Sequence, residues 1–229
     1  MDDFYECGRS RDNRRMREET MSRFNFVKKA ALVVLLAGGV GGKAADFSPR
    51  ASAYFDSRGM PTTSLTLSAS QLPLKTDFFG FVDVYGKKNS LEGADSVYGE
   101  FKLSRKVVKY ISVAVEHNRD FLKPFGVTRL GLSYEPPMVK DGFVGLTLYP
   151  WATQRDGAQA VLYGRKNFKK GDYYIEGFLD YNFKPDNVVS EIQLGRRLYK
   201  KLYGVVEARH NGFMGNRAWG VGVGLELNF

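Results

Sequence analysis

Charged and aromatic side chains occupy every second position in several stretches of this chain, and they are the residues that could do chemistry. Within 172–182, for example, Tyr174 and Glu176 alternate with Tyr173 and Ile175. Aromatic faces stack on flat or ring-shaped solutes, and carboxylate or guanidinium groups hydrogen-bond the hydroxyls of such solutes. A surface lined by both kinds of side chain is suited to binding small polar molecules, provided that the backbone gathers these residues on one face.

Alternation with a period of two indicates β-strands, because successive side chains of a strand point to opposite faces. The longest example ends the chain, where every second residue counted back from Phe229 through Val223 to Trp219 is apolar. This run exceeds the five or six residues usual in globular strands, and its aromatics lie at the ends of the apolar face. Ending on an aromatic resembles the C-terminal assembly signal of bacterial outer-membrane barrels.

The same pattern repeats along the chain and predicts twelve strands joined by turns rich in Gly, Pro and Asn. An even number of strands places both ends of a bacterial barrel on one side of the membrane. The first strand has the weakest pattern, so ten strands is the alternative. The predicted strands are 50–58, 61–70, 76–86, 95–104, 109–118, 126–135, 142–151, 157–166, 172–182, 187–197, 201–210 and 217–229.

Most charges in the middle of these strands avoid the apolar face. In 126–135, Leu130 and Leu132 share that face, whereas Arg129 and Ser133 lie on the other. An arginine or lysine facing lipid near the middle of a membrane costs about 2–4 kcal/mol. A soluble β-sandwich would show the same alternation with its faces exchanged. Uniform strand lengths, aromatic strand ends and an N-terminal export signal favour an all-β, antiparallel transmembrane β-barrel.

That export signal has a basic start, an apolar centre and a cleavage motif. Arg23 and Lys28 precede the apolar run 30–40, and Gly42 and Ala44 have small-x-small spacing. A single anchor helix is the alternative, but this run falls short of the roughly 20 residues that span a bilayer. The predicted organisation is a disordered stretch upstream of the true start over 1–20, a signal peptide over 21–44 and the barrel over 45–229.

Composition excludes several other classes of protein. Removing 1–44 takes away nine basic and six acidic residues, so the formal charge falls from +9 to +6. The remaining basic residues are interleaved with acids, which argues against a nucleic-acid partner. The only cysteine is Cys7, so the barrel has no disulfide. Phosphate-binding loops, dinucleotide fingerprints and clustered metal ligands are missing from the sequence, so we expect neither a cofactor nor a metal.

The interior of the predicted barrel has two interpretations. Ion pairs between its charged residues could fill the lumen, or the same residues could line a narrow channel. A twelve-stranded barrel is wider than the eight-stranded kind that side chains fill outright, which favours a passage.

Several segments resemble the nucleoside-specific channel (Tsx/OmpK) family. Thr63-Ser-Leu-Thr-Leu-Ser-Ala-Ser and Lys75-Thr-Asp-Phe-Phe-Gly-Phe-Val-Asp-Val-Tyr are similar to its second and third strands. Further similarity lies in 98–104, 208–212 and 220–229. The resemblance implies a twelve-stranded monomeric barrel whose lumen binds and passes nucleosides, and it implies that Phe79, Phe81, Asp83, Glu100 and Arg209 line that lumen.

Interior residues from the alternation complete the predicted site. The expected solute-contacting residues are Phe79, Phe81, Asp83, Glu100, Arg129, Tyr174, Glu176 and Arg209. The expected partners are membrane lipid, the outer-membrane barrel assembly machinery and small polar solutes.

Two other functions stay open. An outer-membrane lipid or peptide hydrolase needs a Ser/His or Asp/His set at one rim. His117 and His210 are each followed by Asn, and neither belongs to the His-x-Ser pair of outer-membrane phospholipase or to a metal-binding spacing. An enzyme is therefore not expected. A structural or adhesion barrel that conducts nothing is the third possibility.

The cleavage motif predicts that the mature chain begins at Ala45. N-terminal sequencing of the protein from an outer-membrane fraction should give Ala-Asp-Phe as the first residues. A chain that still carries Met1 or the apolar run 30–40 would contradict the signal-peptide assignment.

Overall fold

The computed structural model describes residues 46–59, 61–86, 94–137, 140–154 and 157–229. Residues 45–229 form one compact unit. The segments assigned to the upstream stretch and to the signal peptide lie outside the described residues.

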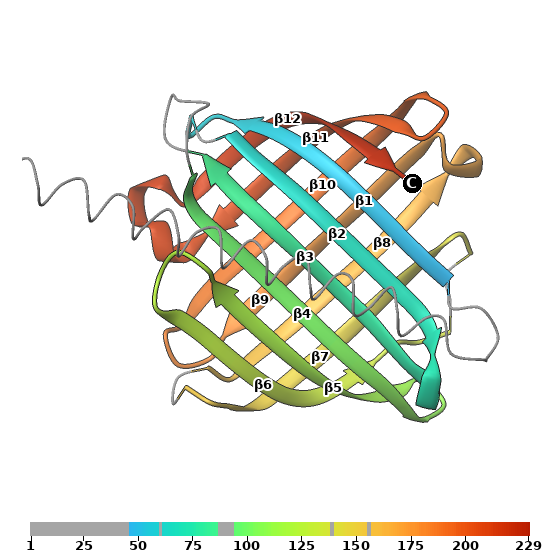
Figure 1. The fold of residues 1–229 in the computed structure, drawn as a ribbon, viewed down its shortest axis with the longest axis vertical. Helices are drawn as coiled ribbons and strands as arrows, with labels where there is room; N and C mark the ends of the chain where they lie inside the picture. The colour runs from blue at the N-terminus through green and yellow to red at the C-terminus, as the bar shows by residue number, and fades with distance from the viewer. Residues whose placement is uncertain (1–45, 60, 87–93, 138–139, 155–156) are drawn as a thin grey trace, which may run out of the picture. The chain divides into compact units, whose positions relative to one another are not determined.

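The described chain is built from antiparallel strands that follow one another in sequence (Figure 1). Three short 3-10 helices lie in the connections, namely η1 (Pro73–Lys75), η2 (Lys169–Gly171) and η3 (Gly212–Arg217). The strands are β1 (Asp46–Asp56), β2 (Pro61–Leu72), β3 (Thr76–Gly86), β4 (Ala94–Val108), β5 (Ile111–Asp120), β6 (Phe125–Tyr134), β7 (Gly142–Ala152), β8 (Gln159–Phe168), β9 (Tyr173–Asn182), β10 (Asn187–Tyr199), β11 (Leu202–Asn211) and β12 (Trp219–Asn228).

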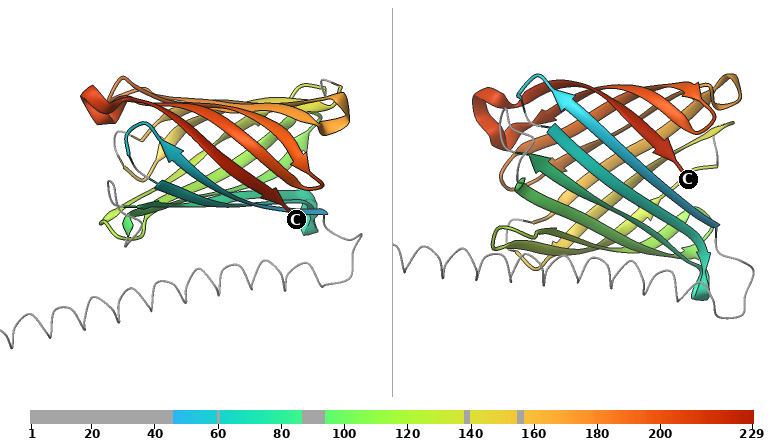
Figure 2. Two further views of the ribbon diagram at one scale, coloured as in Figure 1. Left: turned by 90° about the horizontal axis from the view of Figure 1, so that it is seen from above. Right: turned by 45° about the horizontal axis from the view of Figure 1, so that its top comes forward.

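The sheet closes on itself into a barrel, as the views in Figure 2 show. Each strand pairs with its neighbours in sequence, and β1 pairs with β12 from Arg50 opposite Asn228 to Asp56 opposite Gly222. The prediction of a twelve-stranded antiparallel barrel is thus confirmed, and the ten-strand alternative is wrong. The weakly patterned first strand begins at Asp46, because its pairing with β2 extends to Asp46 opposite Ser70.

The barrel has two distinguishable ends. β1 begins and β12 finishes at one of them, and η1 and η2 lie in connections at that same end, which we call the terminal end. η3 joins β11 to β12 at the opposite end, which we call the loop end; it lies at the left of Figure 1.

The outer surface of the barrel is apolar. Leu65, Val206 and Val223 lie in the middle parts of their strands and are 59%, 49% and 59% exposed. Burying such side chains in water-free lipid is favourable, whereas leaving a continuous belt of them in water is not. This surface therefore matches the hydrocarbon layer of a membrane. Among the described residues, none of the helices is long and apolar enough to cross a membrane.

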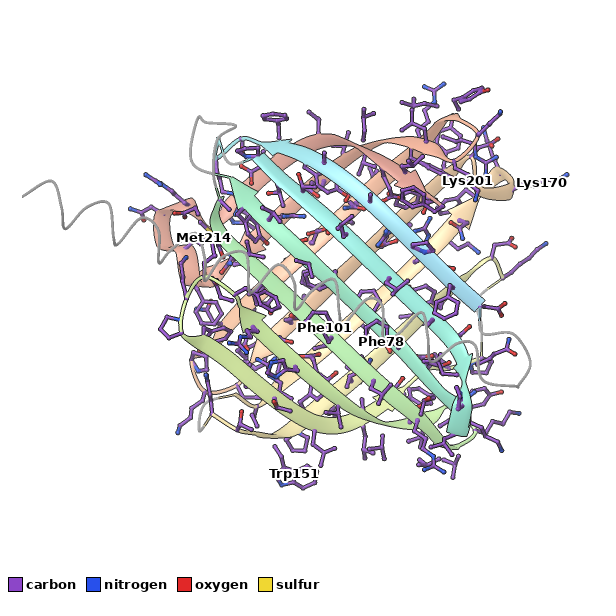
Figure 3. All side chains as sticks on the ribbon, viewed as in Figure 1. Phe78, Phe101, Trp151, Lys170, Lys201 and Met214 are labelled. Carbon is purple, nitrogen blue, oxygen red and sulfur yellow. The ribbon has the colours of Figure 1, made fainter. Side chains whose placement is uncertain are left out.

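Exposed aromatic residues border this belt at both ends. Trp151 and Trp219 are 65% and 70% exposed near the loop end, and Trp151 points away from the barrel wall in Figure 3. Tyr199 and Phe229 are 64% and 61% exposed near the terminal end. Tyr and Trp favour the interface between lipid and water, where one part of the ring is apolar and the other is wet.

The inner surface carries the polar set. Side chains that are directly opposite in neighbouring strands share a face, so the registers assign this surface. Glu116 opposite Arg129 and Glu191 opposite Arg209 are cross-strand ion pairs of the inner face. The barrel is therefore polar inside and apolar outside, the reverse of a soluble β-sandwich.

This orientation makes a testable difference between two positions of β2. Leu65 lies on the outer face and Ser68 on the inner face. Leu65→Arg should lower the free energy of unfolding in lipid vesicles by about 2–4 kcal/mol, because it places a guanidinium in hydrocarbon. Ser68→Arg, the matched control, should change it by less than about 1 kcal/mol, because the lumen is polar. Urea titrations of both variants measure this, and the reverse order would mean that the faces are exchanged.

Candidate functional site in the barrel lumen

All eight residues predicted to contact a solute lie on the inner face of the barrel, but the structure distributes them over three regions. Tyr174 and Glu176 of β9 and Arg209 of β11 belong to one side of the lumen. Arg129 lies on β6. The remaining four lie on two adjacent strands, with Phe79, Phe81 and Asp83 on β3 and Glu100 on β4.

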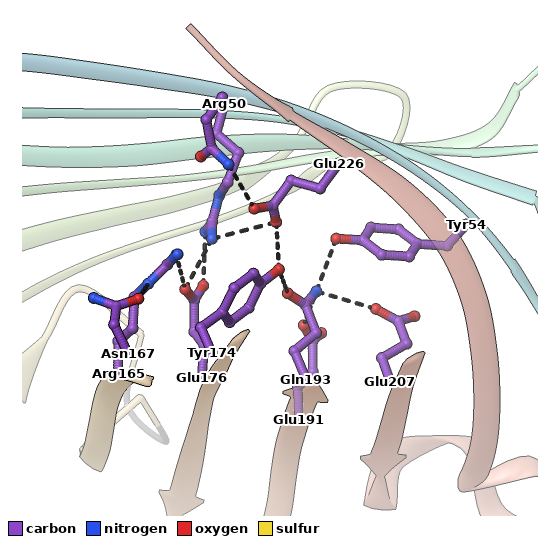
Figure 4. Close-up of polar contacts among 11 residues, drawn as sticks. Arg50, Tyr54, Arg165, Asn167, Tyr174, Glu176, Glu191, Gln193, Glu207 and Glu226 are labelled. Carbon is purple, nitrogen blue, oxygen red and sulfur yellow. Dashed lines mark hydrogen bonds and ion pairs between the residues drawn. The ribbon is translucent and has the colours of Figure 1, made fainter. Parts of the chain in front are cut away.

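A network of hydrogen bonds and ion pairs crosses the lumen between β1 and β9. Arg50 of β1 reaches Glu176 of β9 in a bidentate pair, with Nη1 to Oε2 at 2.8 Å and Nη2 to Oε1 at 2.7 Å (Figure 4). Arg165 of β8 donates to the same carboxylate at 2.7 Å. One carboxylate thus joins two guanidinium groups, in the paired geometry that gives the strongest ionic hydrogen bonds.

Tyrosine and glutamine side chains extend this network toward β10 and β12. The Tyr174 hydroxyl donates to Glu226 Oε2 at 2.8 Å, and Gln193 Nε2 donates to the Tyr54 hydroxyl at 2.8 Å. Figure 4 shows these contacts converging from both walls of the lumen. We call this set the β1–β9 network; its members are Arg50, Tyr54, Arg165, Tyr174, Glu176, Glu191, Gln193, Glu207, Arg209 and Glu226.

A glycine in the adjacent strand leaves room for the Tyr174 ring. Gly195 lies directly opposite Tyr174, and a Cβ atom at this glycine would overlap the tyrosine ring. The ring can therefore lie against the wall, where the Arg165 guanidinium stacks 4.1 Å from its centre. Gly145 has the same relation to Tyr163. Small residues on the inner face thus create space for large ones.

A second network crosses the lumen between β4 and β8. Lys102 Nζ donates to Ser133 Oγ at 3.0 Å, to Thr147 Oγ1 at 3.0 Å and to the Tyr163 hydroxyl at 3.2 Å. The Tyr163 hydroxyl in turn donates to Glu135 Oε1 at 2.7 Å. We call these five residues the β4–β8 network. Its ammonium group is satisfied mainly by hydroxyl groups.

Arg129 lies on the same side of the lumen but nearer the loop end. Its Nη1 pairs with Glu116 Oε1 at 2.7 Å, and its Nε donates to the Gly157 carbonyl at 2.8 Å. Both Arg129 and Glu116 are buried, at 6% and 3% exposed. Arg129 therefore connects the barrel wall to a connection at the loop end.

The inner face of β2, β3 and β4 is different, because its aromatic side chains stand beside hydroxyl groups. The ring centres of Phe79 and Phe81 are 6.1 Å apart, and those of Phe81 and Tyr98 are 6.0 Å apart. Ser68 and Thr66 lie opposite Phe79 and Phe81 in β2. We call this surface the aromatic arc; its members are Ser64, Thr66, Ser68, Phe79, Phe81 and Tyr98.

The aromatic arc stays outside both networks. Within the described ranges, none of its side chains forms a hydrogen bond or ion pair across the lumen. Phe79 is 37% exposed although it lies on the inner face, so part of its ring is open to the lumen. The arc can therefore offer ring faces and hydroxyl groups to a solute.

Sequence reasoning missed Arg50 and Tyr54, which join β1 to the far side of the lumen. The signal that could have found them is the alternation of Arg50, Ser52 and Tyr54 with small or apolar residues. In the parts of the chain that the structure describes, no group of three His, Cys, Asp or Glu side chains could hold a metal ion.

Neither histidine faces the lumen networks. His117 Nδ1 lies 2.9 Å from Thr128 Oγ1 on the outer face of β5 and β6. His210 packs against Trp219, with ring centres 4.7 Å apart. Within the described residues, neither imidazole has a carboxylate partner that would orient it as a general base.

Comparison with known proteins identifies the architecture. No family model matches the chain, and no curated protein matches it in sequence. Among solved structures, the KdgM porin in complex with disordered oligogalacturonate has a TM-score of 0.52 at 17% identity, over 80% of this chain and 99% of the porin. The fold is that of outer-membrane barrels.

Two further structures agree with this result. Outer membrane phospholipase A from Escherichia coli has a TM-score of 0.57 at 10% identity, over 80% of this chain and 96% of the phospholipase. The NanC porin has a TM-score of 0.52 at 10% identity, over 78% of this chain and 98% of the porin. Channels and an enzyme share this barrel fold, so the fold alone does not decide between them. The resemblance to the nucleoside-specific channel family stays a prediction.

The bidentate pair between Arg50 and Glu176 should couple β1 to β9 energetically. Both side chains are about one-fifth exposed, so we expect a coupling free energy of about 1–3 kcal/mol, the range of hydrogen bonds to charged groups. A double-mutant cycle of Arg50→Ala, Glu176→Ala and the double variant, measured by urea unfolding in vesicles, isolates this energy. A coupling near zero would mean that the two side chains do not interact across the lumen.

Proposed function

We propose that this protein is an outer-membrane channel for small polar solutes that carry a flat ring, with nucleosides as the model substrate. The observation that carries the proposal is the aromatic arc, an unbridged strip of ring faces and hydroxyl groups along a lumen that is otherwise crossed by side-chain networks. In this proposal, solutes move along the strip beside those networks.

The chemistry of the arc suits a nucleoside. Phe79, Phe81 and Tyr98 present ring faces in sequence along the wall, on which a base can stack. Thr66 and Ser68 in β2 supply hydroxyl groups at the height of the two phenylalanines, within the reach of a ribose. Asp83 lies on the same face and accepts a hydrogen bond from the Tyr85 hydroxyl at 3.0 Å.

The fold supports a location in the outer membrane, since the apolar belt and its aromatic borders match a bilayer. Two of the structurally similar barrels are porins, and one of them was solved with the acidic saccharide oligogalacturonate. We do not propose that acid as a substrate here. Glu100 and Asp180 face the lumen without an ion-pair partner among the described residues, and like charge repels an acidic saccharide.

A hydrolase is the second candidate, because a phospholipase has the same barrel fold. The pair of His117 and Thr128 is the one imidazole–hydroxyl contact among the described residues. It lacks a carboxylate partner, and threonine is an uncommon nucleophile without further activation. The channel is therefore the function that the lumen supports better.

Conductance of the refolded protein in planar bilayers tests the proposal. We expect small, stable pores whose current adenosine and uridine reduce reversibly. Phe81→Ala should weaken this block by roughly 5- to 100-fold, which corresponds to about 1–3 kcal/mol of base–aromatic stacking. Phe101→Ala removes the same side chain from the outer face of the adjacent β4, so it should leave the block unchanged.

Three outcomes would contradict the proposal. Bilayers without pores would mean that the networks close the lumen and that the barrel is structural. Pores that nucleosides do not block, or block equally in both phenylalanine variants, would remove the assigned substrate class. Release of fatty acid from phospholipid vesicles, abolished by His117→Ala, would establish the hydrolase instead.

A further inference from the structure

Two carboxylates on the inner face lack the ion pairs that other lumen carboxylates form. Glu100 of β4 and Asp180 of β9 have no basic partner within 4.0 Å in the described part of the chain. Glu116, in contrast, pairs with Arg129, and Glu176 pairs with Arg50 and Arg165. Inward-facing carboxyl groups without a basic partner are costly to ionise, and a cationic ligand would favour their charged form.

One oxygen of these carboxylates and three further oxygens of the inner face lack hydrogen-bond partners. They are Asn118 Oδ1, the Tyr149 hydroxyl, Gln159 Oε1 and Asp180 Oδ1. Asn118 and Gln159 are each 4% exposed, and Tyr149 is 1% exposed. Most buried polar atoms in native proteins are hydrogen-bonded, so four unpartnered oxygens in one region need an explanation.

The registers and electrostatic contacts bring these residues together from five strands. Asn118 lies directly opposite Glu100, and Gln159 lies directly opposite Tyr149. Asp180 lies against Gln159 and close enough to Glu100 to interact with its charge. Tyr149 interacts most strongly with Glu116 and also with Glu100. All five side chains belong to the inner face, and these register and electrostatic contacts link them to one another.

The nearby basic residues do not supply the missing charge. The Arg129 guanidinium is held by Glu116 and by the Gly157 carbonyl. The Lys102 ammonium is held by three hydroxyl groups of the β4–β8 network. Both cationic groups therefore donate their hydrogen bonds to residues outside the proposed site. The three carboxyl groups of Glu100, Glu116 and Asp180 also outnumber these two cationic groups. This region therefore has more carboxyl groups than basic groups, and a surplus of hydrogen-bond acceptors.

We propose that Glu100, Asn118, Tyr149, Gln159 and Asp180 form a binding site for an organic cation that carries primary ammonium groups. An ammonium group offers three donors and one positive charge, which complement carboxylate, amide and hydroxyl oxygens. A metal ion fits less well, because no group of three His, Cys, Asp or Glu side chains among the described residues could hold one. The site goes beyond the proposed channel function and does not depend on it, since binding can be measured without conduction.

Isothermal titration of the refolded full barrel with putrescine, at constant ionic strength, tests the proposal. We expect saturable binding of putrescine and no binding of 1,4-butanediol, which has the same carbon chain with hydroxyl groups in place of ammonium groups. Asp180→Asn and Glu100→Gln should each weaken putrescine binding by at least about tenfold, because each removes one of the two carboxyl groups that could form a charge-assisted hydrogen bond to an ammonium group.

Glu207→Gln is the matched control. It removes one lumen charge from the β1–β9 network, where Glu207 pairs with Arg209 at 3.0 Å, so putrescine affinity should change by less than about twofold. Heat-modifiable migration on unboiled gels shows whether each variant is folded. If Asp180→Asn does not fold, the folded Glu100→Gln variant carries the test alone.

Several results would overturn the site. The site is wrong if the barrel does not bind putrescine, if it binds 1,4-butanediol equally well, or if Glu100→Gln leaves the putrescine affinity unchanged. It is also wrong if Glu207→Gln weakens putrescine binding as much as Glu100→Gln does, because that result would indicate an effect of the overall charge of the lumen. Putrescine binding in a barrel that forms no pores would instead overturn the proposed channel and leave the cation site intact.

Discussion

The structure depends on the pairing of β1 with β12, because this seam removes the last open edge of the sheet. In hydrocarbon an unpaired backbone N–H or C=O costs several kcal/mol, so a membrane sheet must close. The seam runs from Arg50 opposite Asn228 to Asp56 opposite Gly222, and the Phe229 N–H extends it by donating to the Pro49 carbonyl. Pro49 has no N–H of its own, which is tolerated near the end of a strand.

Closure of the barrel determines which polar side chains need hydrogen-bond or ion-pair partners inside it. Apolar residues turn outward into lipid, so the interior contains the charges and hydroxyl groups that a soluble protein would leave in water. Glu207 and Glu226 are 2% and 1% exposed, and each accepts a hydrogen bond from another strand, Glu207 from Gln193 of β10 and Glu226 from Tyr174 of β9. Such a network is stabilising only when its members are satisfied, because the local dielectric constant is low. The β1–β9 and β4–β8 networks largely meet this requirement through hydrogen bonds and ion pairs, and they brace the wall across the lumen.

The same requirement distinguishes structural residues from candidate binding residues. Tyr174, Glu176, Arg129 and Arg209 are occupied by partners from the barrel itself, so they serve first to hold its walls together. Phe79 and Phe81 on one wall, and the unpaired carboxylates on β4 and β9, are not occupied in this way. Glu100 lies directly opposite Phe81, so ring faces and an acceptor carboxylate stand side by side on the β3–β4 wall, whereas Asp180 lies on β9.

The sequence by itself determined most of the strands and the faces of their residues, because a period of two is a local property of an extended backbone. It placed Phe81 and Glu100 in the interior for that reason. The choice between ten and twelve strands came from the pairing of β1 in the closed barrel. The sequence could not determine which interior residues touch across the lumen. Arg50 and Glu176 are 126 positions apart, and their contact depends on strand tilt, stagger and closure, which every strand sets together. Only the tertiary structure decided that Glu176 is bridged while Asp180, four residues later on the same face, is left without a counter-charge.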